Sequence, residues 1–339
     1  MKLKTLLTPL ALASAYAAAA TRKQSEFGQE YAPDWPTRSP GEVAEIEANI
    51  ASADTAMFTD YYSFVGRDER GWIGFAIDNN RQRAGSEYEA DHATFMYDAE
   101  IGFVDLVGYG TYETSDEALL HVPDSAYFTF ERSESETVLT STKHDLVLRF
   151  GRTEPHFHDS RPQASALMGL APATLSWQGR ELTGDIVSER LGFKDFDRRK
   201  MGSALAKQTL SNKGFHGLYL TTEHSEVIYL RASNMELGLI DGPSAVGFGN
   251  PGGHSGMFRS VNISVDAWRA APGFYRLPRS WSATWGEGGE FSLSVSEADS
   301  KIYTNWALGG FAMTWVEGTL RSAAGDRSHV AGFAELILP

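Results

Sequence analysis

Four acidic side chains in this sequence could transfer a proton if they lie in an apolar pocket. A carboxyl group in an apolar pocket loses the hydration of its charged form, so its pKa rises and it can donate a proton near neutral pH. Adding water to a carbon–carbon double bond, or removing it, requires such an acid together with a base that handles the water. The candidates for this chemistry are Glu189, Asp195, Asp197 and Glu335.

Basic residues beside these acids leave a structural interpretation open. Glu189 is followed by Arg190, and Asp197 is followed by Arg198 and Arg199. Glu189 could therefore form an ion pair with Arg190 or Arg198, and Asp197 could belong to a solvated charge cluster. In a binding site, Arg190 and Arg198 would instead orient the polar end of a substrate.

Two histidines are further candidates for moving a proton, since imidazole titrates near neutral pH. His216 lies in a short run of glycine and large apolar residues, and His254 lies in the glycine-rich segment 249–256, which could close over a cavity. The alternative for His254 is a surface turn. His156 and His158 alternate as metal ligands on a strand can, but prolines flank them and no distant third ligand is evident, so we predict no metal site.

Large aromatic side chains are numerous enough to line an apolar pocket. Pockets for hydrophobic ligands combine such side chains with a few placed polar groups. For any single aromatic residue, core packing is the alternative. The expected substrate contacts are Trp72, Trp177, Tyr219, Trp281 and Trp306, with Arg190 and Arg198 at the polar end.

The elements that position these residues are predicted to be strands. From Thr59 onward, short runs of alternating apolar and polar residues are separated by turn signals such as Asp78-Asn79-Asn80. The 19 Phe, 13 Tyr and 8 Trp suit the half-buried surface of a sheet. We expect an all-β fold with few helices, built of antiparallel barrels or sandwiches.

A weak internal repeat indicates two similar halves. Residues 71–75 (GWIGF) resemble residues 214–218 (GFHGL), and residues 182–189 resemble residues 330–335, at a period of about 145 residues. The alternative is that glycine-aromatic strands look alike in any β protein. We predict one β-barrel domain over residues 58–193, a connection over 194–210 and a second β-barrel domain over 211–339.

The N-terminal segment resembles an export signal. Residues 1–20 combine two lysines, an apolar run and a final Ala-Ala-Ala, which is typical of a signal peptide. A lead over residues 21–57 follows, with a short helix predicted at 41–53 from apolar residues spaced by three and four. The expected location is the periplasm or the exterior, with no disulfide because the chain has no cysteine. A net charge of −14 argues against nucleic acid and against stable membrane insertion.

Residues 173–190 (ATLSWQGRELTGDIVSER) resemble the central signature of the carotenoid 1,2-hydratase/AttH-like superfamily. Gly184 matches the family glycine, and Glu189-Arg190 stands where the family has an acidic residue followed by a basic one. Val187 and Ser188 replace a family tryptophan. The resemblance implies two lipocalin-like (calycin-type) barrels in tandem, with Glu189 as the acid. The family includes hydratases of isoprenoid double bonds, phytoalexin hydratases, fungal Diels-Alderase-like cyclases and apparent lipid binders.

The leading hypothesis is a lyase of the hydratase or dehydratase type that needs no cofactor. Glu189 would be the acid, His216 or His254 its partner, and Asp197 a further catalytic candidate. The substrate would be a hydrophobic isoprenoid, aromatic or polyketide-like molecule. Two alternatives stay open: an exported carrier of lipids or other hydrophobic ligands, and a cofactor-free isomerase or cyclase whose cavity folds a reactive substrate.

Overall fold

The computed structural model describes residues 26–27, 57–84, 87–106, 109–114, 128–133, 135–160, 164–193, 215–233, 244–253, 255–270, 276–286, 289–305 and 309–338. The signal peptide, the helix at 41–53 and the connection over 194–210 lie outside these residues and stay predictions. In the described ranges, no helix combines the length and apolarity needed to cross a membrane.

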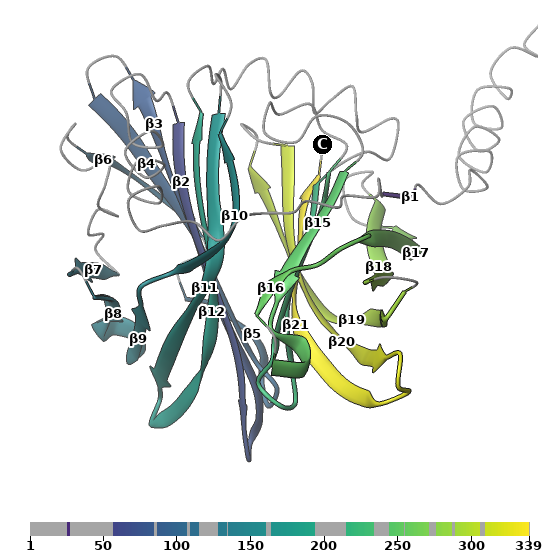
Figure 1. Ribbon diagram of the computed structural model, residues 1–339. Helices are drawn as coiled ribbons and strands as arrows, with labels where there is room; N and C mark the ends of the chain where they lie inside the picture. Colours follow the sequence, from purple (N-terminus) through teal and green to yellow (C-terminus); the bar gives the residue numbers. More distant parts are fainter. Residues whose placement is uncertain are drawn as a thin grey trace, which may run out of the picture.

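Two antiparallel sheets form the described part of the chain, so the all-β prediction is confirmed (Figure 1). The first sheet has 11 strands, in the order β5-β4-β3-β2-β12-β11-β9-β8-β7, with β10 beside β11 and β6 beside β4. Its strands are β2 (Met57–Asp68), β3 (Gly71–Ala84), β4 (Glu87–Asp98), β5 (Gly102–Val104), β6 (Tyr109–Thr114), β7 (Thr129–Arg132), β8 (Glu136–Ser141), β9 (Leu146–Gly151), β10 (Glu154–Ser160), β11 (Ala164–Trp177) and β12 (Arg180–Phe193).

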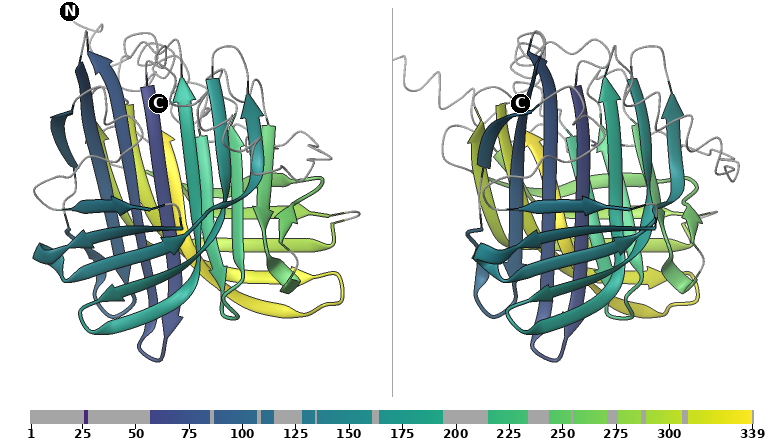
Figure 2. Two further views of the ribbon diagram at one scale, coloured as in Figure 1. Left: turned by 60° about the vertical axis from the view of Figure 1, so that its left-hand side comes forward. Right: turned by 90° about the vertical axis from the view of Figure 1, so that its left-hand side faces the viewer.

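The second sheet has 10 strands, in the order β1-β17-β18-β19-β20-β21-β13-β14-β15-β16. Its strands are β1 (Glu26–Phe27), β13 (Phe215–Thr222), β14 (Val227–Ser233), β15 (Ser244–Gly249), β16 (Gly256–Met257), β17 (Asn262–Ala270), β18 (Arg276–Trp285), β19 (Phe291–Asn305), β20 (Gly309–Ser322) and β21 (Arg327–Leu338). Short 3₁₀ helices occur at Thr142–His144 and Pro251–Gly253. Both sheets curl, so that in Figure 2 the later strands of the first sheet cross in front of β2 to β4.

The two sheets share one topology. In each, the first long strand pairs with the last, β2 with β12 and β13 with β21, and the last also pairs with the strand before it. The repeat between residues 182–189 and 330–335 therefore joins equivalent strands, β12 and β21. The repeat between residues 71–75 and 214–218 does not, because β3 corresponds to β14 and not to β13. The likeness between residues 71–75 and 214–218 therefore reflects the glycine and aromatic content that is common in strands.

The hairpin β11–β12 contains the run on which the family resemblance depends. Its two strands pair without interruption from Ala164–Phe193 to Trp177–Arg180. The loop between them is Gln178-Gly179, where both residues have positive φ, 48° and 76°. A two-residue loop of this kind matches the twist of the flanking strands and fixes their register. Register in turn decides which side chains of β12 face the neighbouring sheet.

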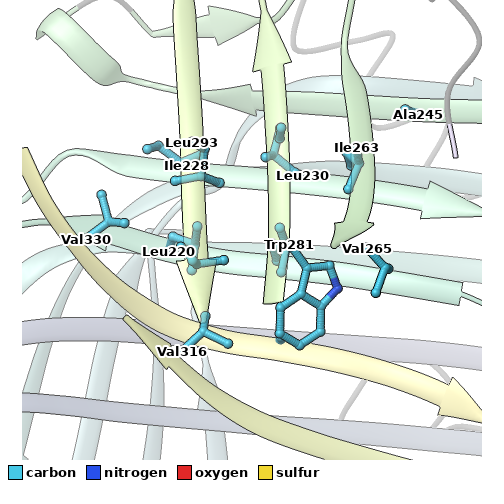
Figure 3. Close-up of a cluster of buried hydrophobic side chains, with 14 of the residues drawn as sticks. Leu220, Ile228, Leu230, Ala245, Ile263, Val265, Trp281, Leu293, Val316 and Val330 are labelled. Carbon is cyan, nitrogen blue, oxygen red and sulfur yellow. The ribbon is translucent and has the colours of Figure 1, made fainter. Parts of the chain in front are cut away.

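In the part of the chain that the structure describes, three apolar clusters form the core. One lies inside the first sheet, around Phe64, Phe75 and Trp177. A second lies inside the second sheet, around Trp281 and its aliphatic neighbours (Figure 3). The third contains side chains from both sheets, including Tyr61 and Tyr219, and it fills the interface between them.

The two sheets approach closely at this interface. The rings of Tyr97 and Trp315 stack with centroids 4.1 Å apart and an interplanar angle of 11°. Gly74 lies against the same region, where a Cβ atom would come within 2.4 Å of the Trp315 ring and 2.7 Å of the Phe333 ring. Polar contacts add to the packing, including a 2.9 Å hydrogen bond from Asn250 Nδ2 to Asp185 Oδ2. The two halves are therefore joined by a continuous apolar core.

Candidate functional site

Two glutamates from different sheets meet at one tyrosine in the interface. The Tyr219 hydroxyl lies 2.7 Å from Glu189 Oε1 and 2.8 Å from Glu335 Oε2. All three residues are buried, with exposed fractions of 2% for Tyr219, 3% for Glu189 and 7% for Glu335. Buried carboxyl groups are rare in protein cores without a compensating partner, and here they gather at one point.

The glutamates occupy equivalent positions in the two halves. Glu189 is on β12, the last strand of the first sheet, and it lies opposite Met168 of β11. Glu335 is on β21, the last strand of the second sheet, and it lies opposite Met313 of β20. The repeated topology therefore brings one carboxyl from each half to the interface, and the tyrosine of β13 joins them.

A guanidinium group balances the first of these carboxyls. Arg231 on β14 places Nη1 3.3 Å from Glu189 Oε2, and both side chains are buried. A buried charge requires a partner of opposite sign, so this ion pair allows Glu189 to be present as a carboxylate. Arg231 Nη1 also lies 4.0 Å from the sulfur of Met168.

Glu335, unlike Glu189, favours the protonated form. Burial raises the pKa of Glu335 to about 8, and the nearby charges of Glu189 and Asp78 contribute to the rise. At pH 7, which lies below this pKa, the protonated form of Glu335 predominates. A protonated carboxyl beside a carboxyl that is paired with a guanidinium group is an arrangement that can supply both an acid and a base.

Aromatic rings pack around the carboxyl pair. The ring of Tyr61 lies 4.7 Å from that of Tyr219, and Tyr229 follows at 5.1 Å from Tyr219. Phe248 continues the row, 4.6 Å from Tyr229. Burial raises the pKa of the Tyr61, Tyr219 and Tyr229 hydroxyls well above 10, so each stays a hydrogen-bond donor. The carboxyl pair is therefore surrounded by buried aromatic side chains.

Arg190 does not join this group. Its neighbour Glu189 points toward the second sheet, whereas Arg190 Nε lies 3.0 Å from Asp60 Oδ1. Arg81 Nη2 lies 2.5 Å from the other oxygen of Asp60. Burial alone would raise the pKa of Asp60, but the guanidinium groups of Arg81, Arg190 and Arg132 lower it to about 2. An ion pair between Glu189 and Arg190, one of our structural alternatives, is not present.

The other predicted residues are distributed over several places. Trp72 belongs to the interface cluster and packs on His329, with ring centroids 5.8 Å apart. Trp177 and Trp281 lie in the separate cores of the first and second sheet. His216 is a residue of β13 opposite Leu336, and its side chain is outside the described part. Asp197, Arg198, His254 and Trp306, together with Asp195, also lie outside the described residues.

The site also contains residues that the sequence analysis does not identify, namely Arg231, Tyr61, Tyr229 and Phe248. The signal for Arg231 was its place in β14 (VIYLRAS), where a lone charge interrupts a run of apolar residues. Tyr61 and Tyr229 gave no comparable signal, because tyrosine is common in strands.

The predicted absence of a metal site stays a prediction. Within the ranges that the structure describes, no three His, Asp or Glu side chains are grouped as metal ligands. His156 and His158 do lie on a strand, β10, and the pairing of that strand with β11 shifts register between Pro155 and Phe157.

Comparison with solved structures places this architecture among known folds. An AttH-like protein from Nitrosomonas europaea superimposes with a TM-score of 0.57 at 12% identity, over 91% of this chain and 99% of that one. This chain has the AttH-like tandem fold. Kievitone hydratase from Nectria haematococca gives a TM-score of 0.52 at 9% identity, over 93% of this chain and 97% of that one. No protein-family model and no curated protein matches the sequence.

Proposed function

We propose that this protein is a lyase of the hydratase or dehydratase type that uses Glu335 as its acid and Glu189 as its base. Glu189 thereby takes the opposite role from the one that the sequence resemblance implies. The observation that carries this proposal is the Tyr219 hydroxyl, which contacts both carboxyls inside the interface. Similarity of fold to a hydratase also supports the proposal.

The geometry supports a balanced cycle for hydration. Glu335 gives its proton to one carbon of a double bond, and the neighbouring carbon becomes electron-deficient. A water oxygen bonds to that second carbon, and the proton that water loses passes to Glu189. Tyr219 then accepts the proton from Glu189 and gives its own to Glu335, which restores the starting state. Dehydration is the same sequence in reverse.

Each charged group has a separate part in this cycle. Arg231 holds Glu189 as a carboxylate before water attacks, because the ion pair compensates the buried negative charge. Burial keeps Glu335 protonated at neutral pH. The aromatic row from Tyr61 to Phe248 would pack on the apolar substrate and help to stabilise positive charge that develops beside the double bond.

The experiment begins with the protein purified from its own host. Native mass spectrometry, followed by extraction, identifies any apolar compound that co-purifies. That compound is then incubated with the protein in water enriched in ¹⁸O. Hydration predicts a product that contains one added water with ¹⁸O, formed by the wild type. Glu335→Gln and Glu189→Gln should each lower the rate about 100-fold or more. The exposed Glu181 provides the control variant Glu181→Gln, which should keep the rate.

The same experiment separates the alternatives. A compound returned unchanged by the wild type would contradict the lyase and support a carrier. A product of unchanged mass without ¹⁸O would support an isomerase or cyclase. Equal rates for the wild type and both glutamine variants would remove the carboxyl pair from the chemistry.

A further inference from the structure

Two hydroxyl groups of β2 lie beside the carboxyl pair without a hydrogen bond of their own. The hydroxyls of Tyr61 and Ser63 interact with each other, but neither has a partner within hydrogen-bond distance among the described residues, and each residue is only 3% exposed. Successive side chains of a strand alternate between its faces, so Tyr61 and Ser63 share one face. Tyr61 and Val65, on that face, belong to the interface cluster.

Orphaned hydroxyls of this kind are uncommon in folded proteins. Most buried polar side-chain atoms are hydrogen-bonded, and an exception calls for an explanation such as a functional role. The neighbouring Tyr219 shows the contrast, because its hydroxyl has two carboxyl partners. Tyr61 packs on Tyr219, and burial keeps its hydroxyl protonated as a donor.

The charged groups around these hydroxyls determine whether a charged or a neutral ligand could bind there. Glu189 and Arg231 compensate each other, and Glu335 is neutral when protonated. Asp78 lies opposite Tyr61 in the register of β2 and β3. A ligand carboxylate or phosphate would bring a further negative charge to a place that already holds acidic groups, and burying it would be costly. A neutral oxygen atom has no such cost.

We propose that the hydroxyls of Tyr61 and Ser63 bind a neutral oxygen atom of the substrate, so that the site takes an uncharged, oxygen-bearing apolar molecule such as an aromatic ketone or alcohol, and discriminates against carboxylic acids. This proposal shares the interface site with the proposed function but makes its claim on binding, whether or not turnover occurs. Tyr61 and Ser63 thereby set specificity, and the carboxyl pair performs the chemistry.

A matched set of three probes tests the proposal by equilibrium dialysis against the full-length protein. The probes are 2-acetylnaphthalene, which has a neutral carbonyl, 2-ethylnaphthalene, which lacks the oxygen, and 2-naphthoate, which is an anion. The wild type should bind the ketone about 3- to 10-fold more tightly than the hydrocarbon, as one or two neutral hydrogen bonds allow. It should bind the naphthoate most weakly.

Two variants locate the effect. Tyr61→Phe removes one hydroxyl and keeps the ring that packs on Tyr219, so it should equalise the ketone and the hydrocarbon. It should change Tm little, because the lost hydroxyl has no partner within hydrogen-bond distance among the described residues. Ser63→Ala should reduce the preference in the same direction. Tyr62→Phe is the control: it also removes a hydroxyl from β2, but that hydroxyl accepts a hydrogen bond from Arg132 Nη2 at 2.8 Å. The ketone preference should survive in this variant.

Three results would overturn the proposal. They are an absence of ketone preference in the wild type, a preference that persists in both Tyr61→Phe and Ser63→Ala, or tightest binding of the naphthoate. Loss of turnover in Glu335→Gln with an unchanged ketone preference would support both proposals at once. A ketone preference in a protein without turnover would support this binding site and contradict the lyase.

Discussion

The Tyr219 hydroxyl has one proton and two carboxyl neighbours, so it cannot donate to both at once. A proton on Glu335 removes the conflict, because that carboxyl can then donate to the tyrosine oxygen while the tyrosine donates to Glu189. The distances of 2.7 and 2.8 Å fit such a chain of hydrogen bonds. At the scale of single residues, the hydrogen bonding of the site therefore depends on a proton carried by Glu335.

Glu335 makes the stability of the protein depend on pH. The folded protein keeps this proton up to about pH 8, whereas an ordinary glutamate releases it near 4.5. The stability from this group is therefore fully present below pH 4.5 and is lost as the pH rises through about 8. Relative to Glu335→Gln, the wild type should lose a few kcal/mol of unfolding free energy between pH 5 and pH 8.5.

Urea denaturation at both pH values measures this difference. Glu181→Gln, at an exposed position, serves as the control and should follow the wild type. Parallel stability curves for the wild type and Glu335→Gln would show that Glu335 is ionised in the folded protein, against the proposed acid.

Asp60 belongs to a buried cluster of ion pairs that stabilises the fold. Its carboxylate and the guanidinium of Arg81 are both fully buried, and Arg190 contacts the second oxygen. Removing one partner of a buried ion pair leaves the other charge uncompensated. Asp60→Asn should therefore destabilise the protein by about 3–5 kcal/mol in urea denaturation. A loss below about 1 kcal/mol would mean that other groups compensate Arg81.

At the scale of elements, a glycine on β3 permits the close approach of the two sheets. Gly74 on β3 has no room for a Cβ atom, because the rings of Trp315 and Phe333 from the second sheet occupy that space. Gly74→Ala should cost about 1–3 kcal/mol through overpacking of the interface. Gly184→Ala is the matched control, since its Cβ would lie 3.6 Å from Phe64, an ordinary contact. Equal effects in thermal unfolding would argue against close packing of the sheets at Gly74.

The strands show which features a sequence reveals. Alternation of apolar and polar residues predicted the all-β class, and the run over residues 173–190 marked the hairpin β11–β12 with its two-residue loop. Glu189 and Glu335 were both among the candidate acids. Their meeting was not predictable, since it depends on which faces of β12 and β21 oppose each other once the sheets have curled. Arg231 follows the same rule, because its partner Glu189 belongs to the other half of the chain.

At the scale of the whole molecule, the interface cluster joins the halves into one unit. Its members come from both sheets, and they would be exposed to water if the halves separated. We therefore expect denaturant unfolding to be a single transition, with coincident midpoints by tryptophan fluorescence and by far-ultraviolet circular dichroism. Two separated transitions would show that each half holds its structure without the other.

The measurement that tests the central claim most directly is the protonation state of Glu335 in the folded protein. Infrared difference spectra between the wild type and Glu335→Gln, recorded across a pH series, report it through the carbonyl band of a protonated carboxyl group. The account predicts this band at pH 7 in the wild type, its absence from the variant, and its loss as the pH passes about 8. A wild type with only ionised carboxylate bands at pH 7 would contradict the account, because Glu335 would then have no proton to give.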